Sequence, residues 1–328
     1  MSPQLIFGTA GFGDDFSEFQ DADSVRDLLV TLQGLGIRRL DTAARYPPFN
    51  PGRAEQLIGE ARPVSNGFLI DTKAYTSTTS DGSGDLTQDA LEKSIAASLE
   101  RLQQQQGEVP VNVLYTHRPD PSTPLEDQIQ AFNQQLAQGR CQHWGVSNTP
   151  PAMLQDILDL CDRNGWQKPR YYQGCYNLIT RGMEKKLLPI LRAHGMQFVS
   201  YQSLAGGFLT GKLINEEHAD TRFGDKNPLG KLFRQAFSGD QLRNALREFD
   251  AGVKGEGLTS IEVAVRWIVH HSALGDGDGV ILGATKTPQI VQTVSMVEKG
   301  PLPPACIKLA DALWDAVADI RGELIKFP

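Results

Sequence analysis

The sequence has few cysteines and no long hydrophobic run. Its four cysteines are scattered without a C-x-x-C pair, which excludes a disulfide scaffold and predicts reduced, buried thiols (Cys141, Cys161, Cys175 and Cys306). No apolar run approaches the roughly 20 residues of a membrane helix. The N-terminus lacks the basic segment and apolar core of a secretory signal. We therefore expect a cytoplasmic protein without a membrane partner.

The chain also lacks any cluster of positive charge. Its 32 basic and 39 acidic residues give a net charge of -7, so nucleic acid is not an expected partner. No group of histidines and cysteines has zinc-binding spacing, and no metal is expected. The 328 residues, 40% of them hydrophobic, suffice for a large core, and we expect residues 1–328 to form a single domain.

Short apolar segments alternate with helical patterns along the whole chain. The predicted strands are residues 5–9, 38–42, 68–73, 111–116, 144–147, 171–175, 197–201 and 279–283. The predicted helices are residues 23–35, 54–59, 87–102, 125–138, 150–164, 183–193, 241–251, 261–271, 288–297 and 304–324, and residues 204–238 form a long irregular stretch. Strands that are apolar on both faces and are followed by helices belong to a parallel sheet.

Eight such units predict an α/β fold, a closed (β/α)8 TIM barrel with a long loop after strand seven and a C-terminal helix. The competing architecture is an open, doubly wound sheet. That fold usually carries G-x-G-x-x-G after its first strand, whereas this turn has the sequence Gly8-Thr9-Ala10-Gly11-Phe12-Gly13 and does not fit the spacing.

Four polar residues lie at the ends of three predicted strands or just beyond them. They are Asp41, Tyr46, Lys73 and His117. In a barrel, the carboxyl ends of the strands face the active site. Each residue alone has a common structural explanation, such as a turn cap for an aspartate or a hydrogen-bonded core position for a histidine. Together, on neighbouring strands, they favour catalysis.

These four residue types suit proton transfer to a carbonyl oxygen. A phenol in water ionises near pH 10. A neighbouring ammonium stabilises the phenolate, and a carboxylate holds the ammonium charged. Asp41, Lys73 and Tyr46 can therefore form a relay that ends in the phenol, while His117 orients the substrate carbonyl. A tyrosine that protonates oxygen while hydride arrives at carbon performs carbonyl reduction.

Two other segments are similar to known motifs but depart from them. Residues 206–213 nearly match a P-loop, yet Leu213 replaces the Ser/Thr that holds Mg²⁺. ATP hydrolysis is excluded on this basis, whereas phosphate contact by the glycine-rich backbone and Lys212 stays open. Residues 276–279 resemble a calcium loop without its closing glutamate, and we expect a solvated turn there.

The longer motifs resemble the aldo-keto reductases. Residues 40–43 with Tyr46, residues 72–73 and residues 114–120 look like the family's aspartate–tyrosine, lysine and histidine segments. Residues 172–177, 204–212 and 280–283 are similar to the branch of aflatoxin-aldehyde and succinic-semialdehyde reductases. The resemblance covers nearly the whole chain and implies a (β/α)8 barrel that reduces an aldehyde or ketone.

The resemblance also implies residue roles. Tyr46 would be the general acid, with Lys73 and Asp41 tuning it and His117 orienting the carbonyl. The cofactor would be NADPH, and the residues implied to bind it are Ser147, Asn148, Gln173, Tyr201, Ser203, Leu204, Gly206, Lys212, Gly283, Ala284, Thr285, Lys286 and Gln289. By the same analogy, Arg222 and Arg234 would lie over the substrate. The partners would be a small carbonyl substrate and a second copy of the chain in a homodimer.

Several alternatives stay open at this point. Strand eight is followed by Ala284-Thr285-Lys286 where some relatives use Lys-Ser for the 2′-phosphate, so NADH is the alternative cofactor. The same site also suits a dehydrogenase or isomerase of secondary metabolism. A third alternative is a cofactor-binding regulatory subunit, like the potassium-channel β subunits of this superfamily. The sequence does not identify the carbonyl substrate.

Overall fold

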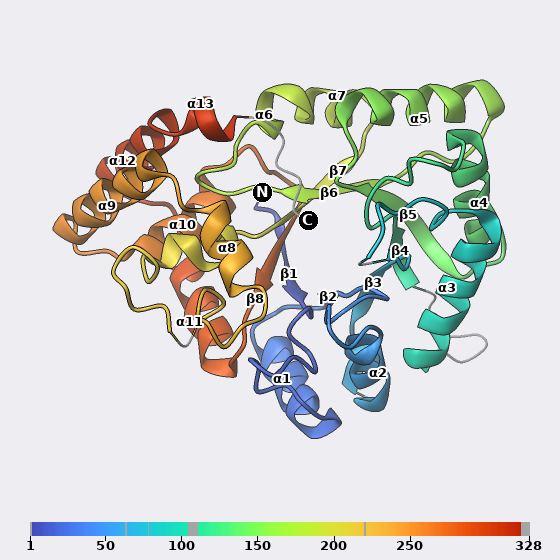
Figure 1. Cartoon of the computed structure of the whole chain (residues 1–328), viewed down its shortest axis with the longest axis horizontal. Coiled ribbons are helices and arrows are strands. Elements are labelled where there is room, and N and C mark those ends of the chain that lie inside the picture. Colours follow the sequence, from blue (N-terminus) through green and yellow to red (C-terminus); the bar gives the residue numbers. More distant parts are fainter. Residues whose placement is uncertain (1, 63, 78, 104–110, 220, 323–328) are drawn as a thin grey trace.

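Eight parallel strands close into a barrel in sequence order (Figure 1). The computed structural model describes residues 2–62, 64–77, 79–103, 111–219 and 221–322. The strands are β1 Gln4–Gly8, β2 Arg39–Asp41, β3 Leu69–Lys73, β4 Val111–Tyr115, β5 Cys141–Ser147, β6 Tyr171–Cys175, β7 Gln197–Tyr201 and β8 Gly279–Gly283. The barrel closes between β1 and β8, where Gln4 pairs with Gly279 and Gly8 with Gly283. The predicted fold class is confirmed.

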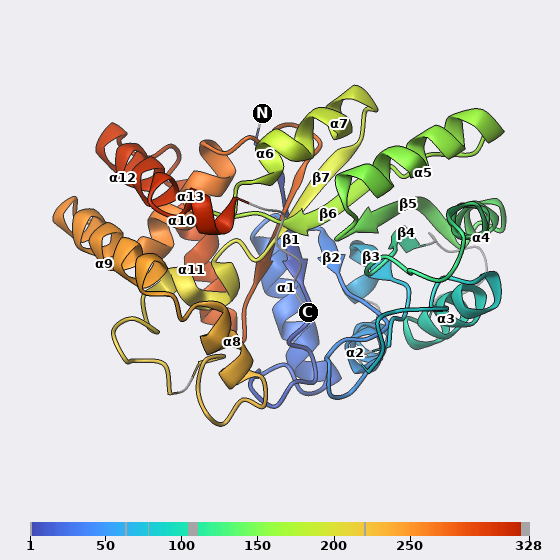
Figure 2. The same ribbon diagram turned by 45° about the horizontal axis from the view of Figure 1, so that its top comes forward.

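Helices surround the strands (Figure 2). They are α1 Ala22–Gly34, α2 Arg53–Glu60, α3 Gln88–Arg101, α4 Leu125–Ala137, α5 Pro151–Asn164, α6 Met183–Lys186, α7 Leu188–Ala193, α8 Gly230–Ala236, α9 Asp240–Gly255, α10 Ser260–His270, α11 Thr287–Glu298, α12 Pro304–Asp315 and α13 Ala318–Arg321, with 3-10 helices η1 Val64–Gly67 and η2 Ala205–Thr210. Local sequence explains their limits. At α1, for example, the Asp21 side chain accepts a hydrogen bond from the Ser24 N–H and caps the helix.

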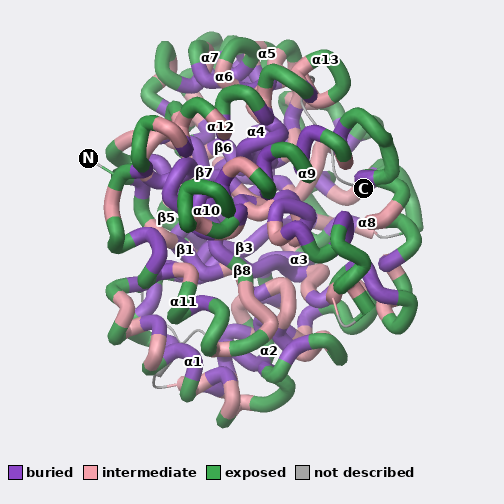
Figure 3. Tube along the Cα trace, turned by 90° about the vertical axis from the view of Figure 1, so that its left-hand side faces the viewer, coloured by how far each residue is buried: buried purple, intermediate pink, exposed green. Residues whose placement is uncertain are grey.

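The main hydrophobic core lies between the strands and the helices. Figure 3 shows buried backbone at the centre of the molecule and exposed helix faces around it. Leu40, Ile70 and Leu114 belong to this core, on the outer face of the barrel. Strand residues alternate between faces, so Asp41 and Lys73 project into the barrel while Thr72 projects outward. This alternation delivers polar groups to the barrel mouth without exposing the core.

Several predicted boundaries are wrong. β5 begins at Cys141, three residues before the predicted strand, because Cys141 pairs with Val111 of β4. The predicted helix over residues 183–193 divides into α6 and α7. Pro189, near the start of α7, has no N–H to donate to the preceding turn.

The C-terminal helix and the long irregular stretch also differ from prediction. The helix predicted over residues 304–324 divides into α12 and α13, and residues 323–324 lie outside the described residues. The stretch over residues 204–238 contains η2 and α8 rather than a loop alone.

The turn over residues 276–279 is solvated only in part: Asp276 and Gly277 are exposed as predicted, whereas Asp278 and Gly279 are buried. The Asp278 carboxylate accepts hydrogen bonds from Arg192 Nη1 at 2.9 Å, from the Phe198 N–H at 2.8 Å and from the Gly275 N–H at 2.9 Å. Asp278 therefore anchors the turn to the start of β7. Over the described residues, no cluster of three or more His, Cys, Asp or Glu side chains is arranged to bind a metal. Within that same part of the chain, no helix has the length and apolarity needed to cross a membrane.

Candidate functional site

A buried ion pair lies at the carboxyl ends of β2 and β3. Lys73 Nζ donates hydrogen bonds to Asp41 Oδ1 at 2.9 Å, to Asp41 Oδ2 at 2.8 Å and to the Thr42 carbonyl at 2.8 Å. Both side chains are almost inaccessible to solvent. Burial alone would lower the pKa of Lys73, but the Asp41 carboxylate raises that pKa above its ordinary value. Lys73 is therefore a fixed cation at neutral pH.

Gln173 of β6 joins this pair from across the barrel. Its Nε2 donates a hydrogen bond to Asp41 Oδ1 at 2.7 Å, although the two residues are 132 positions apart in the sequence. The Asp41 carboxylate is thus held by an ammonium and an amide together. Its orientation is fixed by two strands other than its own.

Tyr46 lies on the loop between β2 and α2, next to Lys73 and His117. The Lys73 ammonium is 5.1 Å from the centroid of the Tyr46 ring. The Tyr46 and His117 rings meet edge to face, with centroids 5.5 Å apart and planes at 84°. The structure therefore brings Asp41, Lys73, Tyr46 and His117 together at the barrel mouth.

His117 follows β4 and carries an unsatisfied polar atom. Its Nδ1 is buried, and no partner for it exists among the described residues. Burial, together with the positive charges of Lys73, Arg45 and Arg118, lowers the pKa of His117 well below its ordinary value. The imidazole is therefore neutral at pH 7, and a neutral imidazole can donate a hydrogen bond to a carbonyl oxygen without being an acid itself.

Asn148 connects the ends of three strands. Its Nδ2 donates to the His117 carbonyl at 3.1 Å and to Ser147 Oγ at 3.2 Å, and Tyr201 Oη donates to Asn148 Oδ1 at 2.6 Å. The Asn148 backbone has a φ of 57°, a left-handed conformation that asparagine tolerates better than most residues. Ser147, Asn148 and Tyr201 thus form one polar cluster beside His117.

Beyond β7 the chain makes a glycine-rich turn. Gly206 and Gly207 have φ values of 65° and 101°, which favour glycine because other side chains rarely adopt them. A Cβ placed at Gly206, or at Gly283 at the end of β8, would have no atom within 4 Å. Ser203 Oγ donates to the Ile281 carbonyl at 3.0 Å and ties this turn to β8. The ends of β7 and β8 therefore have open space beside the backbone at Gly206 and Gly283.

The segment between β8 and α11 is organised by one glutamine. Gln289 Oε1 accepts hydrogen bonds from the Thr285 N–H at 2.9 Å and from the Lys286 N–H at 3.2 Å. Lys286 and Gln289 are exposed, whereas Ala284 and Thr285 are half-buried. At the first residue of α11, the Thr287 N–H donates to Glu18 Oε1 at 2.6 Å. A carboxylate thus already occupies this helix N-terminus.

The remaining predicted residues have different environments. Leu204 precedes η2 and is half-buried, and Lys212 is exposed just beyond it. Arg222 is exposed, stacks over the Phe233 ring at 5.2 Å and interacts electrostatically with Asp14 and Tyr46. Arg234 instead donates to the Phe223 carbonyl and forms an ion pair with Asp225 at 2.7 Å, so its guanidinium is engaged by its own loop. Arg222 is grouped with the site, and Arg234 is not.

Two residues beside the site were not predicted from the sequence. Arg45 directly precedes Tyr46 and Arg118 directly follows His117. Both charges act on His117. The sequence contained one indication of their role: each is adjacent to a predicted catalytic residue.

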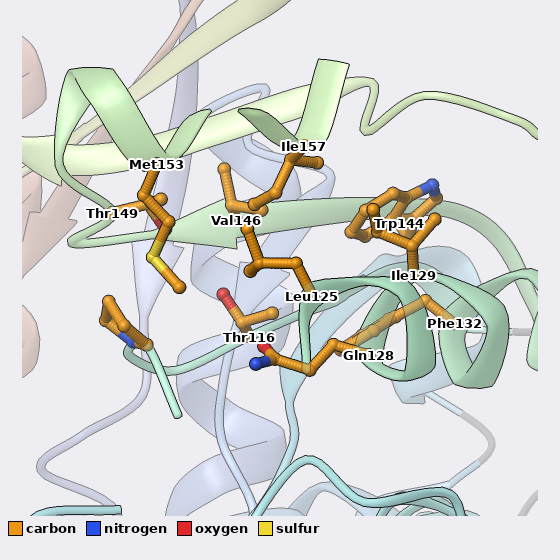
Figure 4. Close-up of a pocket in the computed structure, with 11 residues that line it drawn as sticks. Thr116, Leu125, Gln128, Ile129, Phe132, Trp144, Val146, Thr149, Met153 and Ile157 are labelled. Atoms are coloured by element: carbon orange, nitrogen blue, oxygen red, sulfur yellow. The ribbon is translucent and has the colours of Figure 1, made fainter. Parts of the chain in front are cut away.

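A small pocket lies behind the site, on the helix side of β5 (Figure 4). Its lining comes from β5, α4 and α5 and the segments that follow β4 and β5, and consists of Thr116, Pro119, Leu125, Gln128, Ile129, Phe132, Trp144, Val146, Thr149, Met153 and Ile157. The lining is mainly apolar, and Gln128 Nε2 is already engaged with the Asp120 and Thr123 carbonyls. The pocket is part of the packing between strand and helices and contains none of the four clustered residues.

A model of the Aldo/keto reductase family matches residues 4–315. Aflatoxin B1 aldehyde reductase member 2 of Mus musculus is 33% identical, with 97% of this chain and 86% of the mouse protein covered. Aldo-keto reductase family 7 member A3 of Homo sapiens is 33% identical, covering 86% of each chain. Oxidoreductase sirO of Leptosphaeria maculans is 32% identical, covering 97% of this chain and 95% of its own.

Proposed function

The chain belongs to the aldo/keto reductase family, and from this premise we propose that it is an NADPH-dependent oxidoreductase that reduces an aldehyde or ketone to an alcohol. The observation that carries the proposal is the contact of the buried Lys73–Asp41 pair with the Tyr46 ring, next to a neutral His117. A buried cation beside a phenol and an unsatisfied imidazole is costly to maintain for stability alone.

Tyr46 acts as the general acid. The substrate carbonyl lies between the Tyr46 hydroxyl and His117, which orients it by a hydrogen bond. The nicotinamide, when bound, supplies a hydride to the carbonyl carbon. Tyr46 gives its proton to the carbonyl oxygen, and the Lys73 ammonium stabilises the tyrosinate that results. Asp41 holds the ammonium in place.

The same strand ends offer a place for the cofactor. Ser147, Asn148 and Gln173 would hold the carboxamide, and Tyr201 would stack on the nicotinamide ring. The pyrophosphate would lie on Ser203, Leu204, Gly206 and Lys212, and the adenosine on Gly283, Ala284, Thr285, Lys286 and Gln289. The open backbone at Gly206 and Gly283 supports this placement. Arg222 would cover the substrate. Arg234 would contact the substrate only after its own loop rearranges.

One observation favours NADH as a second candidate cofactor. The Glu18 carboxylate accepts a hydrogen bond from the Thr287 N–H, at the end of the predicted adenosine site. An acidic group there repels a 2′-phosphate and suits a 2′-hydroxyl. The exposed Lys286 ammonium acts in the opposite direction. Fluorescence titration with NADPH and NADH separates the two candidates.

Replacing Tyr46 by phenylalanine tests the proposal. We expect Tyr46→Phe to lower kcat for aldehyde reduction by at least about 100-fold, because general acid catalysis contributes about 10² to 10⁴. The affinity for the cofactor should be unchanged in the fluorescence titration. Tyr75→Phe, a phenol on the next loop with an exposed ring, is the matched control and should keep full activity. Full activity of Tyr46→Phe would exclude Tyr46 as the proton donor.

A further inference from the structure

Two arginines beside Tyr46 and His117 form no ion pair within the described residues. Over the described ranges, neither Arg45 nor Arg118 forms an ion pair, although the Asp85 carboxylate acts on Arg45 and the Asp81 carboxylate on Arg118 over a longer distance. Nine other arginines of the described chain do form ion pairs, namely Arg26, Arg39, Arg53, Arg101, Arg140, Arg181, Arg192, Arg234 and Arg266. Arg45 and Arg118 are half-buried, whereas most of the other arginines outside these pairs are exposed, namely Arg38, Arg163, Arg170, Arg222 and Arg247.

Both guanidinium groups lie under the same loop, between β3 and α3. Arg45 Nη1 donates to Thr76 Oγ1 at 3.4 Å. Arg118 Nη2 donates to the Ser77 carbonyl at 2.7 Å and to the Ser80 carbonyl at 2.8 Å. Because Thr76 and Ser77 are consecutive, the loop holds the two like charges in one region.

The contacts of Arg118 leave part of its donor capacity unused. Its Nε is buried and has no hydrogen-bond partner among the described residues. A Cβ added at Gly82 would lie 2.9 Å from this Nε, so the loop backbone packs directly against the guanidinium. The loop therefore holds Arg118 in place without satisfying all of its donors.

The nearby aspartates accept hydrogen bonds from the loop backbone. Asp85 Oδ2 accepts from the Ser77 N–H at 2.9 Å, and Asp81 Oδ1 accepts from the Ser83 N–H at 3.0 Å. Lys73 is paired with Asp41. Burial lowers the pKa of Arg45, Arg118 adds to that shift, and Tyr46 and Asp85 oppose it. An arginine nevertheless stays charged at neutral pH, so the region beside His117 holds two cations on which Asp81 and Asp85 act only from beyond ion-pair distance.

Burying part of a guanidinium group without an ion-pair partner costs free energy, and a bound anion offsets that cost. Their planar forks match the oxygens of carboxylates and phosphates. We propose that Arg45 and Arg118 form an anion subsite, so that the preferred carbonyl substrate also carries a carboxylate or phosphate group. The subsite is formed by residues of the segments that follow β2 and β4. This inference rests on the proposed function and deepens it.

Matched substrates test the subsite directly. The panel is 4-carboxybenzaldehyde, 4-formylphenyl phosphate and methyl 4-formylbenzoate, which share an aromatic aldehyde and differ in charge. Losing a hydrogen bond to a charged group costs about 1.5–3 kcal/mol, so we expect Arg45→Met to lower kcat/KM for a charged aldehyde by about 10- to 100-fold. The neutral ester should lose clearly less than the charged aldehydes, because it makes no charged contact and is affected only through the Arg45 charge on His117. The charged aldehyde with the larger loss identifies the anion as carboxylate or phosphate.

Arg26→Met is the control, since Arg26 is a partly exposed arginine paired with Asp23 on α1. It should leave all three substrates unchanged. Arg118→Met should repeat the selectivity of Arg45→Met, and its circular dichroism spectrum shows whether the loop anchors were needed for folding. If Arg118→Met unfolds, Arg45→Met decides, because among the described residues the Arg45 guanidinium donates a single hydrogen bond, at 3.4 Å. Equal losses for charged and neutral aldehydes would overturn the subsite.

A binding measurement separates this inference from the proposed function. If the wild type reduces none of the aldehydes, the proposed function fails, and the subsite is then tested by calorimetry with 4-(hydroxymethyl)benzoate and its methyl ester. Tighter binding of the acid than of the ester, lost in Arg45→Met, supports the subsite. Equal binding of acid and ester rejects it.

Discussion

Lys73 has three acceptors for its three protons, and this limits how it acts on Tyr46. Both Asp41 oxygens and the Thr42 carbonyl receive its hydrogen bonds. The ammonium therefore has no proton left to donate to the Tyr46 hydroxyl in this arrangement. Its effect on Tyr46 is that of a fixed positive charge 5.1 Å from the ring centroid. In a dry site, such a charge stabilises an adjacent anion more than it does in water.

Replacing His117 by asparagine should change the pH dependence of stability. The pKa of His117 is lowered in the folded state, mainly by burial, while the unfolded value is about 6.5. Below about pH 6.5 the unfolded chain therefore binds a proton that the folded chain resists, and stability falls as the pH falls. We expect the loss of unfolding free energy between pH 7.5 and pH 5 to be smaller in His117→Asn than in the wild type. Urea unfolding at the two pH values measures it.

The control for this prediction is His194→Asn, a histidine at the end of α7 outside the site. It should keep the wild-type difference between the two pH values more closely than His117→Asn does. Identical pH dependence of His117→Asn and the wild type would show that His117 is not held neutral by the fold.

At the scale of elements, α2 and α3 approach each other through a glycine. A Cβ at Gly59 would lie 2.1 Å from the Arg101 carbonyl oxygen and 3.0 Å from the Leu102 carbonyl carbon. Near this contact, Glu55 of α2 is buried and pairs with Arg101 at 2.7 Å, and Thr72 of β3 donates to it at 2.5 Å. The close approach of the two helices thus supports the strand that carries Lys73.

Gly59→Ala should destabilise the protein despite the better helix propensity of alanine. The new methyl group meets backbone atoms that cannot move away easily, and such overpacking costs about 1–3 kcal/mol. Gly34→Ala at the end of α1 is the control, because no atom lies within 4 Å of its Cβ position, and it should be neutral or stabilise by about 0.4–1 kcal/mol. Urea unfolding of both variants gives the comparison. A stabilising Gly59→Ala would mean that α2 and α3 separate at little cost.

At the scale of the whole molecule, Asp278 links the last strands of the barrel. Its side chain joins α7 through Arg192 and β7 through Phe198, and its carbonyl accepts from the Gln4 N–H at 2.8 Å at the start of β1. This residue thus lies where the first and last strands meet. We propose that residues 1–328 form one domain closed at this seam, and the homodimer stays a prediction.

Asp278→Ala should weaken the closed barrel. The substitution leaves the Phe198 and Gly275 N–H groups without their acceptor and Arg192 without its partner. Unsatisfied donors and a broken ion pair of this kind cost about 2–5 kcal/mol together. Asp276→Ala in the same turn is the control, because that side chain is exposed. Thermal unfolding followed by circular dichroism measures both, and an equal melting temperature for the two variants would contradict the anchoring role.

Local patterns determined much of this protein. The alternation of apolar strands with amphipathic helices predicted eight units and a barrel, because the period at which apolar residues recur is a property of neighbouring residues. The same pattern placed Asp41, Lys73 and His117 at strand ends, and barrel geometry brings such ends to one rim. Strand and helix limits were less exact, as β5 and the division of the helix after β6 show, because they depend on pairing partners and on single residues such as Pro189.

Only the tertiary structure decided which side chains are partners. Gln173 reaches Asp41 across the barrel, Arg234 turns to its own loop, and Asp278 is buried at the seam. The absence of an ion-pair partner for Arg45 and Arg118, over the part of the chain that is described, is likewise a property of the assembled loops. Sequence periodicity sets which face a residue occupies. The charges and donors that meet there are set by barrel closure, which joins segments more than a hundred residues apart.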